Sequence, residues 1–301
     1  MFESKFPAVI DSTIMKEWTR CKQATFQKYF LGKRMVEGNY HDLNVGKSIA
    51  SAMEETRKCF YVYGQSELDS IENGLRVLVD QYGEDFPDSC KSISKCKEVF
   101  YLYFKKYPLD KDFGLVPISS GVECKFSFGI GIEHPDTGKE LMYSGRFDMI
   151  AEEKGEDPFF SMSEENKLWV VDEKTTKMLF GSNWMYDYDL DWQMIGYKWA
   201  SSKMGYDVHG VKVRKLVMGK KKINPLTDLP EISIHFNEKT ISDWESNMIN
   251  IANEMVDIYK KNEFAKSYGN ACNEYKGCDY RSICLNLPQP EWAEVRWNPL
   301  D

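Results

Sequence analysis

The sequence predicts an α/β fold in which helices flank a central mixed sheet. Apolar residues recur at helical spacing through the first third of the chain, and the pattern then changes to the alternation typical of strands. A further helical segment, rich in aromatic residues, separates the third predicted strand from the fourth. With 301 residues, 42% hydrophobic and 14% aromatic, the chain can bury a sizeable core.

Helices are expected throughout the region before the first strand. The first carries Trp18 and Phe30, and the second spaces Ile49 and Met53 for one buried stripe. Helical patterns continue toward the first strand. The predicted helices of this region cover 15–31, 45–63, 67–82 and 90–107.

Alternating β-branched and aromatic residues predict the strands that follow. The segment 136–138, Asp-Thr-Gly, supplies a turn between the first two. A helix over 189–203 separates the last two strands, and a long helix over 242–264 opens at a cap formed by Thr240 or Ser242. The predicted strands cover 121–132, 141–150, 168–174 and 208–218.

Two of these strands carry the main candidate site. Side chains alternate between the faces of a strand, so Asp172 and Lys174 point the same way and Glu173 points to the opposite face. A second carboxylate, Asp148, lies near the end of the strand 141–150, which can pair with the strand that holds Asp172. Two acids and a lysine on neighbouring strands are typical of a divalent-metal site with a charge stabiliser beside it.

The ordered motifs resemble the core of the PD-(D/E)XK nucleases. They read Gly-Arg-Phe-Asp148, then Val-Asp172-Glu-Lys174-Thr, then Gln193-Met-Ile-Gly-Tyr197. The chain is similar to the RecB-like branch, which includes Cas-type nucleases and single-strand exonucleases with an iron–sulfur cluster. A lone Asp-x-Lys triplet more often marks a solvated charge pair, but the ordered set favours the nuclease. The resemblance implies a restriction-endonuclease-like core, a helical N-terminal region and a C-terminal cysteine clasp.

The resemblance also implies a reaction, the metal-dependent hydrolysis of phosphodiester bonds in DNA. Asp148, Asp172 and the backbone carbonyl of Glu173 are expected to hold one or two Mg²⁺ or Mn²⁺ ions, because hard cations take oxygen ligands. Such an ion activates a bound water and neutralises charge on the leaving oxygen. Lys174 is expected to position that water or to stabilise the charged transition state.

The helix 189–203 adds two residues to this expected site. Gln193 and Tyr197 are four positions apart, so they share one helical face. In the family that face looks toward the active site and the DNA backbone. The plainer alternative is a polar helix edge with a core tyrosine.

One position departs from the family pattern. Members with the full motif carry a histidine ligand within Gly-x3-His-x3-Glu, and the corresponding stretch runs from Gly46 to Glu54 with Ala50 at the histidine position. Without an imidazole, the expected site has only oxygen ligands, which suit Mg²⁺ better than the softer Mn²⁺. Alternatively, the loss of this ligand weakens catalysis. His41 precedes the motif and is more simply a loop histidine, and Glu123 is more simply a solvated strand carboxylate.

The cysteines give an independent signal. Three of the eight are evenly spaced near the C-terminus, at Cys272, Cys278 and Cys284, and Cys21 stands alone near the N-terminus. In the iron–sulfur members of the RecB-like branch such a split set holds a [4Fe–4S] cluster, so the resemblance implies that role for these four. The first spacing differs from the family's usual Cys-x2-Cys. The same thiols would also suit a tetrahedral Zn²⁺ or remain unbound.

Charge and hydropathy limit the expected partners. The net charge of −8 opposes long-range attraction to DNA, so nucleic-acid contact has to come from local basic patches. No apolar run approaches the roughly 18 residues that span a bilayer, and the start resembles neither a signal nor a transit peptide. We therefore expect no membrane contact and a cytoplasmic location, that of the host for a virus-encoded chain. The candidate patch, whose alternative is a solvated hairpin end, comprises Arg214, Lys215, Lys220, Lys221 and Lys222.

We expect three regions along the chain: a helical N-terminal region (1–115) with the first cluster cysteine, a nuclease core (116–240), and a C-terminal helix with the cysteine-rich segment (241–301). The favoured function is a metal-dependent deoxyribonuclease, an exonuclease acting on single strands or duplex ends in recombination, repair or replication. The sequence contains no Walker loop, the signature of a helicase, so we expect the nuclease to act as a stand-alone chain.

The alternative function is a catalytically impaired member that binds DNA and serves as a scaffold or subunit of a recombination or replication complex. A helicase, a recombinase or further copies of the chain are the partners considered. The intact Asp148, Asp172 and Lys174 favour the enzyme, because a scaffold has no use for that triplet.

Overall fold

The computed structural model describes residues 2–37, 40–83, 89–154, 167–177, 184–219, 222–273 and 277–300. The chain divides into two compact units, and each is described by itself. The first unit comprises 1–39, 125–146 and 238–301, and the second comprises 40–124 and 147–237.

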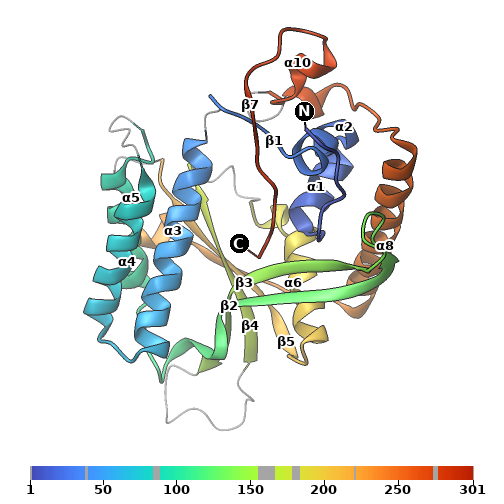
Figure 1. Ribbon diagram of the computed structural model, residues 1–301. Helices are drawn as coiled ribbons and strands as arrows, with labels where there is room; N and C mark the ends of the chain where they lie inside the picture. Colours follow the sequence, from blue (N-terminus) through green and yellow to red (C-terminus); the bar gives the residue numbers. More distant parts are fainter. Residues whose placement is uncertain are drawn as a thin grey trace. The chain divides into compact units, whose positions relative to one another are not determined.

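The second unit contains most of a five-stranded sheet with helices packed on it (Figure 1). The strand order is β2-β3-β4-β5-β6, in which β4 and β5 are parallel while β3–β4 and β5–β6 are antiparallel. The mixed α/β class expected from the sequence is therefore confirmed. The strands are β2 (Gly114–Glu133) and β3 (Glu140–Lys154), which contribute to both units, β4 (Lys167–Thr176), β5 (Val208–Val217) and β6 (Glu231–Ile234).

The helices of the second unit begin at side-chain caps in several places. Ser66, Ser92 and Asp191 each accept a hydrogen bond from a backbone N–H in the first turn that follows. The helices are α3 (His41–Arg57), η2 (Lys58–Val62), α4 (Glu67–Tyr82), α5 (Ile93–Lys106), η3 (Trp184–Asp187), α6 (Trp192–Lys203) and α7 (Pro225–Asp228).

A close approach between α3 and α4 fixes the position of α3. A Cβ atom on Gly74 of α4 would lie 1.9 Å from the Thr56 hydroxyl and 2.7 Å from the Ala52 carbonyl oxygen, so only glycine fits there. Apolar residues of α3, α4 and α5, among them Ile49 and Leu78, form one buried cluster. Helix α3 is therefore held rigidly where it also packs on β4.

Helices cover both faces of the sheet around β4. On one face Glu173 contacts Tyr103 of α5, and on the other Lys174 contacts Gln193 of α6. Because consecutive side chains of a strand point to opposite faces, α5 and α6 lie on opposite sides of the sheet. The middle of β4 is thus enclosed by both layers.

The first unit is built around aromatic contacts between its N-terminal helices and the segment that follows α8. The expected helix 15–31 is broken at Cys21, whose backbone is extended with φ −161° and ψ 112°. Phe26 stacks on Phe264 with ring centroids 4.1 Å apart. The elements are α1 (Ser12–Arg20), α2 (Lys22–Thr25), η1 (Phe26–Phe30), β1 (Lys33–Met35), α8 (Glu238–Lys261), α9 (Asn270–Asn273), α10 (Arg281–Cys284) and β7 (Trp292–Glu294).

Three short strands had no counterpart among the sequence-based expectations. They are β6 and the antiparallel pair β1 and β7, which together form a separate two-stranded sheet. Runs of three or four residues are too short for alternation to be read from sequence alone. Among the described residues, no helix combines the length and the apolar character needed to cross a membrane.

Candidate active site

Strands β3 and β4 bring the two candidate aspartates and the lysine together. Met149 pairs with Val171, which places Asp148 beside Asp172 on adjacent strands. Asp148 Oδ2 accepts a hydrogen bond from the backbone N–H of Glu173 at 2.9 Å. The ammonium nitrogen of Lys174 lies 3.0 Å and 2.9 Å from the two carboxylate oxygens of Asp172.

Helix α6 adds both of its predicted residues to this group. Lys174 Nζ donates to Gln193 Oε1 at 2.9 Å, and Gln193 Nε2 donates to the Tyr197 hydroxyl at 2.6 Å. The Asp191 side chain caps the helix by accepting from the Gln193 N–H at 2.7 Å. Since Tyr197 is buried against Phe147, it holds the Gln193 amide with its oxygen toward Lys174.

The two aspartates place two carboxyl groups side by side in the protein interior. Burial, and then the carboxylates of Asp172 and Glu173, raise the pKa of Asp148 to about 7 against the opposing effect of Lys174. Burial also raises the pKa of Asp172, against the opposing effect of Lys174. Burial opposes charge on Lys174, but the two aspartates outweigh it and hold the lysine pKa above its usual range. The site therefore favours cations.

The donor set suits a hard divalent cation. Asp172 is fully buried, and within the described part of the chain its Oδ2 makes no hydrogen bond, although the Lys174 ammonium is near. Together with Asp148 it offers carboxylate oxygens on adjacent strands. The described residues contain no group of three or more His, Cys, Asp or Glu side chains arranged to hold a metal ion. Further ligands to such an ion would have to be backbone carbonyls or water.

A cavity of about 360 Å³ opens beside these residues, and we call it the Asp148 cavity. Asp148, Lys174 and Glu123 line it together with Ala50 of α3, the position of the absent histidine noted in the sequence analysis. A longer side chain at position 50 would thus start from the wall of this cavity. His41 lies elsewhere, with its ring against Tyr82.

Two further acidic residues considered in the sequence analysis, Glu54 and Glu123, differ in their surroundings. Glu54 forms an ion pair with Lys58 one turn along the helix. Glu123 has a left-handed backbone with φ 51°, which few residues other than glycine adopt.

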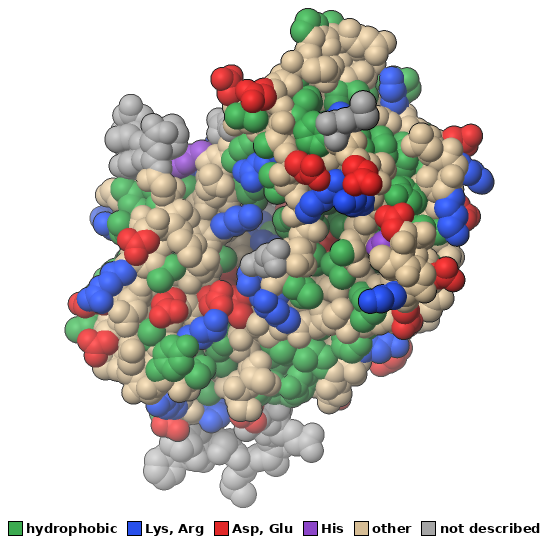
Figure 2. All heavy atoms as spheres, viewed as in Figure 1, with side chains coloured by type: hydrophobic (Ala, Val, Ile, Leu, Met, Phe, Trp, Pro, Cys, Tyr) green, Lys and Arg blue, Asp and Glu red, His purple; other side chains and the backbone are tan. Residues whose placement is uncertain are grey.

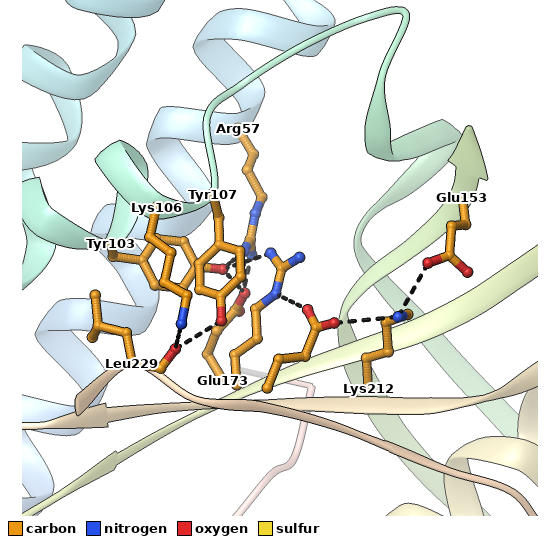
Figure 3. Close-up of polar contacts among 10 residues, drawn as sticks. Arg57, Tyr103, Lys106, Tyr107, Glu153, Glu173, Lys212 and Leu229 are labelled. Atoms are coloured by element: carbon orange, nitrogen blue, oxygen red, sulfur yellow. Dashed lines mark hydrogen bonds and ion pairs between the residues drawn. The ribbon is translucent and has the colours of Figure 1, made fainter. Parts of the chain in front are cut away.

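The opposite face of β4 carries a buried charge network that the sequence analysis missed (Figure 3). The Arg57 guanidinium binds both oxygens of Glu173, and both side chains are more than nine-tenths buried. The Tyr103 hydroxyl donates to Glu173 at 2.6 Å and accepts from Arg214 at 3.0 Å. The sequence contains one indication of this network. Arg57 continues the four-residue spacing of Ile49 and Met53, so it lies on the apolar face of the helix, where a cation needs a buried partner.

This network keeps Glu173 ionised and in place. Burial alone would raise the pKa of Glu173, but Arg57 and then Arg214 outweigh burial and hold it below its usual range. The same residue aims its backbone N–H at Asp148. The side chain of Glu173 thus belongs to the supporting structure, and its main chain belongs to the site.

The structure separates the members of the predicted basic patch. Arg214 belongs to the buried network, while Lys215 is buried with its ammonium nitrogen 5.0 Å from the centre of the Tyr188 ring. Lys215 is the β5 partner of Lys174. Lys222 is exposed, whereas Lys220 and Lys221 lie outside the described residues. A role for the patch in DNA binding stays a prediction.

Tyr188 is a further neighbour of the site that the sequence did not point out. Burial, with a smaller contribution from Asp172, raises the pKa of Tyr188 to about 12 against the opposing charge of Lys174. Its hydroxyl therefore stays protonated at neutral pH and can donate a hydrogen bond.

The four cysteines of the predicted clasp lie in one neighbourhood of the first unit. The Cys21 sulfur accepts from the Ser267 N–H at 3.5 Å, and the Cys272 thiol donates to the Ser267 carbonyl at 3.3 Å. Burial raises the pKa of Cys284, and Cys21 and Cys272 are close enough to add to this effect. Burial and Cys21 likewise raise that of Cys278. Two of these thiols, Cys21 and Cys272, contact Ser267, and in the described residues the four do not form a metal-binding group.

Asparagine at position 148 is expected to change how stability depends on pH. The pKa of Asp148 is about 7 in the folded chain against 3.8 ordinarily, so between these values the folded state binds more protons than the unfolded state. The resulting stabilisation is complete below about pH 4 and is lost as the pH rises through 7. Asp148→Asn should therefore be more stable than the unmodified chain at pH 8, by on the order of 1–3 kcal/mol.

Urea unfolding in the presence of a chelator, at pH 4, 6 and 8, measures this difference. An equal gain at pH 4 and pH 8 would mean that ionisation of Asp148 is not its cause.

The chain matches no family model and no curated protein. Among solved structures it is similar to a protein of Eubacterium rectale that has been proposed to be an exonuclease, with 12% identity over 88% of this chain and 86% of that one and a TM-score of 0.46. It is also similar to SSO0001, with 14% identity over 78% of this chain and 83% of that one and a TM-score of 0.32. Likenesses at this level carry no argument about activity, which rests on the geometry of the site.

Proposed function

We propose that the chain is a metal-dependent deoxyribonuclease of the PD-(D/E)XK type, an exonuclease of the RecB-like branch that hydrolyses phosphodiester bonds at DNA ends. One observation carries the proposal: Asp148, Asp172 and Lys174 meet on adjacent strands, and Gln193 binds the lysine from helix α6. These residues are far apart in sequence, and packing alone gives no reason to bury two carboxylates side by side.

Each residue has a defined part in the proposed reaction. Asp148 and Asp172, with the backbone carbonyl of Glu173, would hold Mg²⁺ or Mn²⁺, which supplies Lewis acidity and an activated water. Lys174 has three N–H donors that now serve Asp172 and Gln193. With an oxygen of Asp172 committed to such an ion, a donor of Lys174 would be available to a phosphate oxygen. Gln193, anchored by Tyr197, keeps the ammonium in place.

DNA would have to be attracted locally. Acidic and basic side chains are interspersed over the face shown in Figure 2, and the whole chain carries a net charge of −8. Of the described members of the basic patch, Arg214 and Lys215 are buried and Lys222 is exposed, so we propose Lys222 for contact with the DNA backbone. Because the salt dependence of DNA binding grows with the number of phosphates that cations neutralise, binding through so few cations should be weak and should decrease only slightly with salt.

The test is cleavage of labelled DNA by the purified chain. Single-stranded and duplex oligonucleotides, labelled at either end, are incubated with Mg²⁺, with Mn²⁺ and with a chelator, alongside an RNA of the same sequence. We expect metal-dependent release of short products from DNA ends. DNA binding without cleavage in either metal would instead favour the scaffold function. If the chain neither binds nor cleaves DNA, the nuclease function and the scaffold function are both refuted.

Histidine at position 50 is expected to shift the metal preference. Because the site has only oxygen donors, Mg²⁺ should support cleavage about as well as Mn²⁺ in the unmodified chain. In Ala50→His the added imidazole starts from the wall of the Asp148 cavity and should favour Mn²⁺, since nitrogen ligands strengthen binding of the softer ion.

Cleavage rates titrated with each metal, for both proteins and for an Ala50→Leu size control, measure this. A strict Mn²⁺ requirement in the unmodified chain would show that a nitrogen ligand is already present.

We also propose that Cys21, Cys272, Cys278 and Cys284 form a clasp that holds a [4Fe–4S] cluster, with Zn²⁺ as the alternative occupant. Support comes from the gathering of the four thiols within one unit, where Cys21 and Cys272 contact Ser267 and where Cys278 and Cys284 each lie near Cys21. Four thiolates meet the demand of either occupant. The clasp would tie the N-terminal helices to the C-terminal segment.

Protein purified without oxygen is expected to be brown and to contain about four iron atoms per chain. Cys278→Ser should lose the iron and unfold at a lower temperature, because metal-binding free energy becomes folding free energy at such a clasp. Cys96→Ser, which alters a buried thiol of the second unit, serves as the control. If the protein contains zinc and no iron, the clasp holds Zn²⁺ in place of the cluster. If it contains neither metal, the proposed clasp is wrong.

A further inference from the structure

A second cavity of about 440 Å³ lies in the same unit, and we call it the Tyr107 cavity. Its walls come from the end of α5, the connection to β2, the end of β3, and strands β5 and β6. Arg57 lines both this cavity and the Asp148 cavity. The two are therefore neighbours on either side of the Arg57–Glu173 ion pair.

The Tyr107 cavity is positive within an acidic protein. Five cationic side chains line it against three carboxylates, while the chain as a whole has a net charge of −8. Glu173, which pairs with Arg57, reduces this excess without removing it. The cations are Arg57, Lys106, Lys154, Lys212 and Arg214.

Two of these cations have no carboxylate as a direct partner in the described structure. Lys106 donates to the Leu229 carbonyl at 2.7 Å, and Lys154 donates to the Lys111 carbonyl at 3.0 Å. By contrast, Lys212 lies 3.2 Å from both Glu153 and Glu231 (Figure 3). Burial lowers the pKa of Lys106, so an anion beside it would favour its charged form.

Aromatic rings form much of the remaining wall. Arg214 lies over the face of Tyr107, with the guanidinium carbon 4.0 Å from the ring centre. Figure 3 shows Tyr107 and Lys106 converging on the carbonyl of Leu229. Phe113, which is 43% exposed, also lines the cavity and offers an accessible ring. Aromatic and guanidinium planes are the surfaces on which nucleobases stack.

We propose that the Tyr107 cavity binds a nucleoside monophosphate, with the phosphate near Lys106 and the base against the aromatic wall. The volume falls within the range of pockets for small ligands, and the lining combines cations with flat rings. The ligand is either a free mononucleotide or the terminal nucleotide of a strand. Its biological meaning rests on the proposed nuclease function, since hydrolysis at a DNA end releases mononucleotides.

The test is equilibrium binding by calorimetry in the presence of a chelator, which removes metal-dependent binding at the Asp148 cavity. The probes are deoxyadenosine monophosphate, deoxyadenosine, inorganic phosphate and a 5′-phosphorylated decathymidylate. We expect the monophosphate to bind at least about tenfold more tightly than either of its halves. Tighter binding of the decathymidylate would identify the strand terminus as the ligand. Tighter binding of the monophosphate would identify the free nucleotide.

Matched variants assign the binding to this cavity. Lys106→Met should weaken monophosphate binding about tenfold, and Phe113→Ala should weaken it while leaving phosphate binding unchanged. Lys105→Met alters the exposed neighbour on the same helix and should have no effect. Asp172→Asn should bind normally, so this inference can hold even if the chain cuts no DNA. Absence of monophosphate binding at millimolar concentration, or equal loss in Lys105→Met and Lys106→Met, would overturn it.

Discussion

Asparagine in place of Asp172 is expected to abolish DNA cleavage, with a loss of about 10³-fold or more in single-turnover rate. The change keeps the volume of the side chain and an oxygen for Lys174, but it removes the charge that a divalent ion requires. Since Asp172 is fully buried and its pKa is raised chiefly by burial, removing the charge should leave the free energy of unfolding unchanged or higher. Product release from end-labelled DNA and urea unfolding measure the two effects.

The neighbouring residues provide the controls for this prediction. Asp148→Ala and Lys174→Ala should be as inactive as Asp172→Asn, because each removes a metal ligand or transition-state charge. Glu173→Gln should retain far more activity, since its side chain lies on the opposite face, bonded to Arg57. An inactive Glu173→Gln together with an active Lys174→Ala would show that the roles assigned along β4 are wrong.

Methionine in place of Arg57 is expected to cost about 3–5 kcal/mol of unfolding free energy. The Arg57 and Glu173 side chains are only 3% and 7% exposed, so the variant leaves a buried carboxylate without the cation that binds it directly, with the more distant Arg214 left to oppose its charge. Tyr103 still donates to that carboxylate, but a single hydroxyl does not replace a bidentate guanidinium. Chemical unfolding monitored by circular dichroism measures the loss.

Two further variants separate the buried charge from general effects of removing an arginine. Arg57→Met combined with Glu173→Met should recover much of the lost stability, because no unpaired charge remains. Arg76→Met removes an exposed arginine that lies 4.0 Å from Glu72, and it should cost less than about 1 kcal/mol. If Arg57→Met cost no more than Arg76→Met, the network would not support the fold.

Local pattern was sufficient for much of the fold. The helix expected over 67–82 coincides with α4, and the strands expected at 141–150 and 168–174 lie within β3 and β4 and pair as expected. The opposite directions of Asp172 and Glu173 follow from strand alternation, which depends only on sequence position.

Other features depend on contacts between distant segments. The parallel register of β4 and β5 sets Glu173 opposite Arg214, and nothing in either segment alone fixes that register. The backbone break at Cys21 interrupts a continuous helical periodicity, so sequence alone placed one helix there. The Tyr107 cavity likewise combines residues from several elements, and its charges resemble ordinary surface lysines when read along the chain.

Strand β4 also has a consequence for how such a protein changes over evolutionary time. Its Asp172 face carries a carboxylate whose burial is costly, whereas its Glu173 face carries the ion pair to α3 and the hydrogen bond to α5 that hold these helices to the sheet. Mutations on the first face can silence the reaction while the polypeptide still folds and persists in the cell. A lineage could thus lose cleavage through one substitution and keep a folded protein on which selection can act. Homologues that no longer cleave DNA should therefore retain Arg57 and Glu173 after Asp172 has been replaced.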